Sequence, residues 1–169
     1  MINQIKSIYK VCIILIIIFY FQNNYKLFNR PIWYNPKKII SFNGNGRDTS
    51  NQIFDIYSFC HITQGMVINI LLHGLNIPFN YRILITTIIV LLWELYENSQ
   101  KTINKFKKQY NQYNGDSIVN VIGDLMSCLL GVYLINKYPN YSYIYLIVSE
   151  IILSKYKANF IYLTLTGFC

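Results

Sequence analysis

Residues 83–97 read Ile-Leu-Ile-Thr-Thr-Ile-Ile-Val-Leu-Leu-Trp-Glu-Leu-Tyr-Glu, an uncharged apolar run that ends in two acids. Extended back to Phe79, the run is long enough to cross a bilayer as a helix. An acid at the centre of such a helix costs about 2.5–3.5 kcal/mol on insertion scales. Glu94 and Glu97 therefore stand where membranes normally exclude carboxylates, and this predicts a functional site.

The rest of the chain has the same character. Apolar residues make up 53% of the 169 residues, charged residues make up 13%, and the mean hydropathy is +0.28. These values argue against an ordinary soluble domain and against a disordered chain. We expect an all-α, polytopic membrane protein, a single integral membrane domain over 1–169 with about five transmembrane helices. The expected segments are span 1 (7–22), an interfacial loop (23–54), span 2 (55–75), span 3 (79–97), span 4 (117–135), span 5 (141–153) and an interfacial tail (154–169).

The net charge of +8 is carried mainly by the expected loops. Eleven of the 15 Lys and Arg residues fall on the side of the bilayer that holds the basic loop 99–115. The positive-inside rule places this side in the cytoplasm and the N-terminus outside. No nucleic-acid motif accompanies the charge, so the expected partner is the lipid bilayer with its anionic headgroups and not a nucleic acid.

The seven acids are concentrated at the ends of the expected spans, and only Asp48 is clearly in a loop. Antiparallel neighbours bring the start of span 2, the end of span 3 and the start of span 4 to the same cytoplasmic side. In span 4, Asp116, Asn120 and Asp124 share one helix face, and Asp116 is expected to cap the helix. The predicted polar site consists of His61, Glu94, Glu97, Asp116, Asn120 and Asp124. Glu150 lies apart, and we expect it to pair with Lys155 or Lys157.

The carboxylates of this predicted site suggest a cation. Four of them, Asp116, Asp124, Glu94 and Glu97, offer oxygen ligands, which suit Mg²⁺, Mn²⁺ or Ca²⁺ better than zinc. His61 could add a nitrogen ligand or act as a general base. Protonation, or pairing with His61 and basic residues, would also relieve the repulsion among these acids.

Three sequence blocks carry a resemblance to a known family. They are Asp55-Ile-Tyr-Ser-Phe-Cys-His-Ile-Thr-Gln-Gly65, Trp93-Glu-Leu-Tyr-Glu-Asn98 and Gly115-Asp-Ser-Ile-Val-Asn-Val-Ile-Gly-Asp124. In this order, from about Trp33 to the C-terminus, the chain resembles the domain-of-unknown-function 2585 family of bacterial multi-pass inner-membrane proteins. It is similar in fewer features to VanZ-like proteins. The resemblance implies this topology and polar constellation, and no established activity.

The chain departs from the family pattern at a few positions. Ile56 stands where the family usually has Trp or Pro. Gln64 stands where a second histidine is frequent, which makes a two-histidine metal site less favoured here. Ala158 replaces the Asp of an Asp-Asn pair, which leaves the role of the C-terminal segment open.

Three functions fit these observations. The first is a site that binds a cation or a lipid headgroup, with or without catalysis on a lipid-linked substrate. The second is a structural or scaffold protein whose polar cluster only pins the helix bundle through interhelical hydrogen bonds. The third, proton or ion transport, is the least favoured, because the acids lie on one side only and no inverted repeat is present.

Overall fold

The computed structural model describes residues 31–32, 39–42, 49–108 and 111–167. The described residues form six helices: α2 (Ile56–Gly74), α3 (Phe79–Glu97), α4 (Gln100–Lys107), α5 (Ile118–Lys137), α6 (Pro139–Ser154) and α7 (Phe160–Thr166). Two short strands, β1 (Ile40–Ser41) and β2 (Phe54–Asp55), precede them. The all-α class is confirmed. The expected first span at 7–22 lies outside the described residues.

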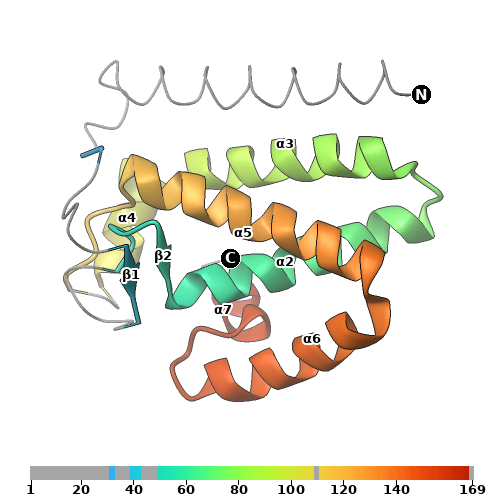
Figure 1. The fold of residues 1–169 in the computed structure, drawn as a ribbon. Helices are drawn as coiled ribbons and strands as arrows, with labels where there is room; N and C mark the ends of the chain where they lie inside the picture. The colour runs from blue at the N-terminus through green and yellow to red at the C-terminus, as the bar shows by residue number, and fades with distance from the viewer. Residues whose placement is uncertain (1–30, 33–38, 43–48, 109–110, 168–169) are drawn as a thin grey trace.

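Helices α2 and α5 form the centre of the bundle (Figure 1). Helix α3 packs on both of them, α6 packs on α5 and α2, and α7 lies against α2 and α6. Val90 and Leu91 of α3 meet Val121, Leu125 and Cys128 of α5 in a buried apolar cluster. This packing fixes the lateral position of the three helices whose ends carry the predicted site.

Small residues let α2 and α5 approach closely. A Cβ atom added at Gly65 would collide with the backbone carbonyl of Cys128, and one added at Gly131 would collide with that of Ile62. The two glycines thus place each helix backbone directly against the other.

The start of α2 is held by a reciprocal cap. The Asp55 carboxylate accepts hydrogen bonds from the backbone N–H groups of Tyr57 and Ser58, and the Ser58 hydroxyl accepts one from the Asp55 N–H. The preceding strand β2 pairs in parallel with β1, with Ile40 opposite Phe54. The segment 23–54, expected to be a loop, therefore contains β1 and the first residue of β2.

Two other expectations, at the end of the bundle where α3 ends and α5 begins, are wrong. The basic segment 99–115, expected to be a loop, contains α4, because Ile103 and Phe106 on one face of this helix are buried. The cap of α5 is Ser117, whose hydroxyl accepts from the Asn120 N–H, and not Asp116. The Asp116 carboxylate is engaged by Asn98 instead.

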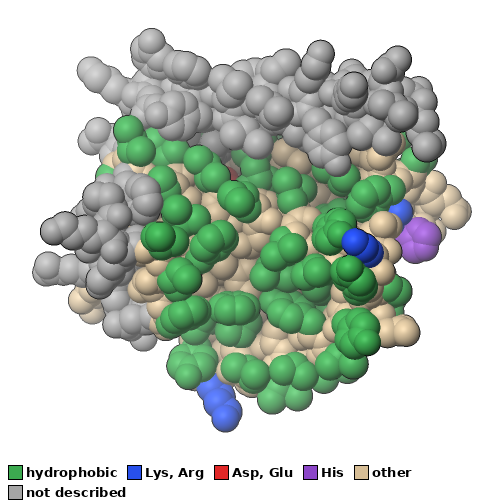
Figure 2. Space-filling view, in the orientation of Figure 1, with side chains coloured by type: hydrophobic (Ala, Val, Ile, Leu, Met, Phe, Trp, Pro, Cys, Tyr) green, Lys and Arg blue, Asp and Glu red, His purple; other side chains and the backbone are tan. Residues whose placement is uncertain are grey.

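Helices α3 and α5 have the length and apolar composition needed to cross a membrane. Among the other described helices, α6 has 16 residues and is shorter than a usual span, and α2 is made more polar by His61, Gln64 and Asn69. The described part of the chain thus supplies two of the five expected spans by this measure. Much of the described surface on the face seen in Figure 2 is nonetheless apolar. On α6 the exposed aliphatic side chains are Ile144, Ile147, Val148, Ile151 and Ile152.

Candidate functional site

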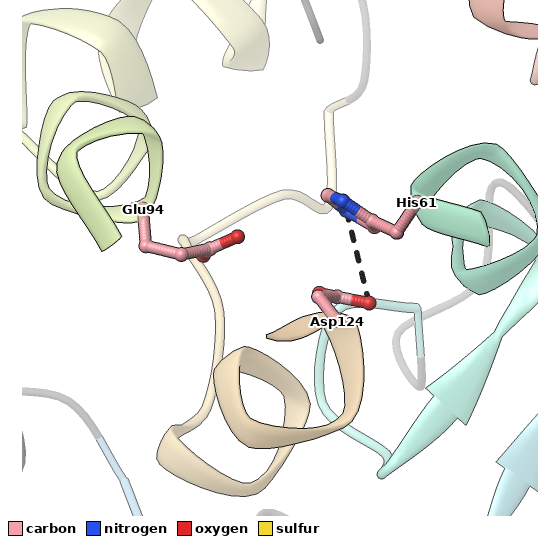
Figure 3. A group of neighbouring side chains, drawn as sticks. All are labelled: His61, Glu94 and Asp124. Atoms are coloured by element: carbon pink, nitrogen blue, oxygen red, sulfur yellow. Dashed lines mark ion pairs between the residues drawn. The ribbon is translucent and has the colours of Figure 1, made fainter. Parts of the chain in front are cut away.

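The structure brings together three of the predicted site residues from three helices (Figure 3). His61 comes from the second turn of α2, Glu94 from the last turn of α3 and Asp124 from the second turn of α5. One ligand atom from each lies within 4.8 Å of the other two. Glu94 is 1% exposed and Asp124 is 5% exposed, so the carboxylates are buried. We refer to His61, Glu94 and Asp124 as the buried triad.

The orientation of His61 is set by its neighbour Gln64. The two side chains lie one turn apart on α2, and His61 Nδ1 is 3.0 Å from Gln64 Oε1. Since the amide oxygen accepts, Nδ1 carries the proton, and in a neutral imidazole Nε2 then presents its lone pair. That Nε2 atom lies 3.7 Å from Asp124 Oδ1. A lone pair facing a carboxylate oxygen at this distance requires a proton or a cation between them.

The second oxygen-rich group shares Glu94 with the buried triad. Ligand atoms of Glu94, Glu97 and Asp116 also lie within 4.8 Å of one another. Protein donors already occupy part of this group. Trp93 Nε1 donates to Glu97 Oε2 at 2.6 Å, and Tyr113 and Asn98 donate to the Asp116 carboxylate. A cation here would have to share these carboxylates with the existing donors.

Asp116 and Asn120 have clear structural partners. Asn98 Nδ2 donates to Asp116 Oδ2 at 2.8 Å, and the Asp116 backbone N–H donates to Asn98 Oδ1 at 2.8 Å. Asn120 Nδ2 donates to the backbone carbonyl of Gln52 at 2.9 Å. These bonds join the end of α3, the start of α5 and the segment before α2. Such bonds are expected if the polar residues serve to hold the helices together.

Asp55 lies beside the same helix ends and has a perturbed titration. Burial raises the pKa of its carboxyl to about 6. Hydrogen bonds from the N–H groups of Ser50, Tyr57 and Ser58 oppose the shift, and the nearby Asp116 adds to it. Asp55 therefore caps α2 while contributing to the crowding of acids at this end.

Three residues outside the predicted set organise the site. Gln64 orients His61, Asn98 holds Asp116, and Gln52 supplies the carbonyl that Asn120 contacts. The i, i+3 spacing of His61 and Gln64 and the i, i+4 spacing of Glu94 and Asn98 place each pair on one helix face and were available signals. Nothing in the sequence pointed to Gln52.

Glu150 does not make the expected pair with Lys155 or Lys157. Its carboxylate accepts from the Asn159 side chain at 2.9 Å and from the backbone N–H groups of Phe160 and Ile161 at 2.8 and 3.1 Å. The N-terminus of α7 is a cluster of donors without intrahelical partners, and a carboxylate satisfies them. Glu150 therefore fastens the C-terminal helix to α6 and lies outside both groups of potential ligands.

The comparisons with known proteins agree with the resemblance seen in the sequence. The profile of the family described as "Protein of unknown function (DUF2585)" matches residues 28–165. A UPF0314 protein of Paracoccus denitrificans is 27% identical over 105 residues, which cover 60% of this chain and 54% of the relative. A UPF0314 protein of Sinorhizobium fredii is 32% identical over 101 residues, covering 56% of this chain and 50% of the relative. The matches thus span about half the length of these curated relatives, and no solved structure matches the chain.

Proposed function

We propose that this chain, which belongs to the DUF2585 family of proteins of unknown function, binds a divalent cation inside a membrane-embedded helix bundle. The buried triad is the proposed binding site. The ligands are His61 Nε2 and one carboxylate oxygen each from Glu94 and Asp124. The observation that carries the proposal is the placement of Nε2 and Asp124 Oδ1, which face each other at 3.7 Å. Within the described residues, Asp124 Oδ1 is buried and has no hydrogen-bond partner.

The chemistry of the triad favours Mn²⁺ or Mg²⁺. Two carboxylates neutralise a divalent charge, and carboxylate oxygens suit Mg²⁺ and Mn²⁺, while an imidazole nitrogen favours the transition metal of the two. Three protein ligands leave other coordination positions for water or for an oxygen of a bound headgroup. A lipid-linked phosphate is a substrate of the right kind, since it offers such oxygens at the depth where the helices end.

Membrane location rests on the apolar character of the chain. Helices α3 and α5 are long and apolar enough to cross a bilayer, and the outer face of α6 exposes a row of aliphatic side chains. A soluble protein rarely exposes an apolar area of this extent. We propose that the bundle sits in the membrane with the triad near the cytoplasmic interface, on the side that carries most of the Lys and Arg residues.

Thermal unfolding of the purified full chain in detergent tests the cation proposal. After removal of metal with a chelator, Mn²⁺ or Mg²⁺ should raise the unfolding temperature. At 100 times the dissociation constant, an ion that binds only the folded state adds about 2.7 kcal/mol to the free energy of unfolding. Asp124→Asn and His61→Gln should each remove the shift. Glu150→Gln changes an acid outside the triad and should keep it.

The alternative structural role makes a different prediction in the same experiment. If the polar residues only pin the helices, Asp124→Asn lowers the unfolding temperature whether or not the ion is present. An unfolding temperature that no divalent cation changes would exclude the cation site. A shift produced by Zn²⁺ alone would keep the site and reject its assignment to Mn²⁺ or Mg²⁺.

A further inference from the structure

The charged residues of the bundle are separated by sign along its length. The six described acids lie towards the end where α2 and α5 begin and α3 ends. The opposite end, where α2 turns into α3 and α5 into α6, carries His73, Arg82 and Lys137. The sequence has no acid within 70–85 or 130–145, the two segments that form this end. Figure 2 shows basic side chains and a histidine at this edge of the molecule.

Arg82 is the buried cation of this end. It lies in the first turn of α3 and is 7% exposed. Its Nη1 donates to Asn69 Oδ1 of α2 at 3.1 Å, and its Nη2 donates to Asn136 Oδ1 of α5 at 3.3 Å. The guanidinium thus contacts both central helices through neutral amide oxygens, which hold its plane in a fixed orientation.

The hydrogen-bonding capacity of Arg82 is only partly used. Its Nε is buried and has no hydrogen-bond partner among the described residues. Thr86 lies one turn deeper on the same face of α3, and no described residue is a hydrogen-bond partner of its buried hydroxyl. No described carboxylate pairs with Arg82, although a buried charge needs a counter-charge. The Phe79 ring, whose centroid lies 5.2 Å from Arg82 Cζ, offsets part of the charge, and an anionic acceptor would compensate the rest.

The local backbone also favours an anion. Helix α3 begins at Phe79, and its N-cap residue Pro78 makes no side-chain hydrogen bond to the first turn. The free N–H groups at a helix start carry a partial positive charge and bind phosphate in many proteins. The guanidinium fork matches the geometry of phosphate oxygens and can bind two of them at once.

We propose that Arg82, oriented by Asn69 and Asn136, binds a phosphate group at the end of the bundle opposite the buried triad. The group belongs either to a phospholipid headgroup or to free phosphate, and both present the same oxygens to Nε and the remaining N–H donors. The proposal concerns a second site and does not need a cation at the triad. Its lipid source depends on the membrane location proposed above.

Unfolding of the full chain in a neutral detergent tests this site, with a chelator present to keep the triad free of metal. Three additives are compared: inorganic phosphate, short-chain phosphatidylglycerol and a diacylglycerol with the same acyl chains and no phosphate. Stabilisation by phosphatidylglycerol but not by diacylglycerol supports a headgroup site. Stabilisation by inorganic phosphate as well supports the same site with free phosphate as a ligand.

The variants separate binding from folding. Arg82→Gln should lose the phosphate-dependent shift, while Lys137→Gln, an exposed cation at the same end, should keep it. Arg82→Lys retains a cation that can reach an amide oxygen but lacks the fork, and we expect its affinity to fall about tenfold. If Arg82→Gln does not fold, Arg82→Lys decides the question. Equal stabilisation by diacylglycerol, the same shift in Arg82→Gln, or an unchanged affinity in Arg82→Lys would overturn the proposal and leave Arg82 as a clamp between helices.

Discussion

The close approach of α2 and α5 predicts a large effect of adding one methyl group. In Gly65→Ala, the new Cβ would lie against the backbone carbonyl of Cys128, far inside normal contact distance. Non-bonded carbon atoms have their optimal separation at about 3.5–4 Å, so the two helices would have to move apart by about 1 Å or more. A backbone carbonyl within a helix has no alternative rotamer that would relieve the contact, unlike the end of a flexible side chain. The contact can therefore be relieved only by displacing a whole helix.

The expected cost follows from this geometry. Overpacking a well-filled interior costs about 1–3 kcal/mol, and a rigid backbone neighbour places Gly65→Ala at the upper end of that range. The helix preference of alanine over glycine returns up to about 1 kcal/mol. Gly74→Ala is the matched control, because a Cβ there meets nothing within 4 Å in the same helix. The two variants should differ by about 3 kcal/mol, or roughly 6–12 °C in unfolding temperature for a chain of this size.

The same variant also reports on the candidate site. Gly65 lies one turn after His61 on α2, and Cys128 lies one turn after Asp124 on α5. Separation of the helices at this contact should therefore increase the distance between His61 and Asp124 and weaken the Mn²⁺-dependent shift, while Gly74→Ala keeps it. Unfolding of both variants within a degree of each other would refute the packing argument. A lower unfolding temperature with full Mn²⁺ stabilisation would refute its link to the site.

Three further predictions come from other contacts. Burial raises the pKa of Asp55 to about 6, so the folded chain binds this proton more tightly than the unfolded chain does, and the free energy of unfolding should fall by roughly 3 kcal/mol as the pH rises from about 4 to 7. Asp55→Asn should flatten this pH dependence in a series of unfolding curves, and an unchanged slope would contradict the assignment. Glu150→Ala removes the acceptor for the N–H groups at the start of α7 and should cost about 1–2 kcal/mol, with faster amide exchange in α7 than in α6; equal exchange in the two helices would count against it. In sealed vesicles of known orientation, a cysteine introduced by Lys107→Cys at this exposed position of α4 should be labelled from the cytoplasmic side, and labelling from the other side would reject the orientation drawn from the basic residues.

The positions of the helices could be predicted from apolar runs and turn residues. The expected spans at 79–97 and 55–75 agree closely with α3 and α2, because Pro78, Asn76 and the adjacent apolar residues limit where a helix can begin and end. Helix α4 was missed because its buried face consists of few residues among many lysines. That face becomes visible only when a partner surface covers it, as happens for Ile103 and Phe106.

The structure brings His61, Glu94 and Asp124 of the predicted polar site together, and the detailed contacts of the predicted residues could not be foreseen. The convergence of helix ends follows from alternating helix direction, which is why His61, Glu94 and Asp124 could be expected together. Rotation about each helix axis decides which acids face one another, and this depends on the contacts of Gly65 and Gly131. The sequence therefore could not tell that Asp116 would be bonded to Asn98 while Asp124 would face His61.

The reciprocal bonds between Asn98 and Asp116 have a consequence for how this architecture can vary. They join two residues that are 18 positions apart, so the segment between Asn98 and Asp116, which contains α4, starts and ends at one fixed point. Doubling the length of a flexible connection costs only about 0.6 kcal/mol in closure entropy. The part of this segment that follows α4 can therefore be lengthened or given a reporter peptide without moving the ends of α3 and α5, while Ile103 and Phe106 keep α4 packed on the bundle. We therefore expect insertions among homologous chains to occur between α4 and Asp116, and an engineered epitope there should leave the interior of the bundle unchanged.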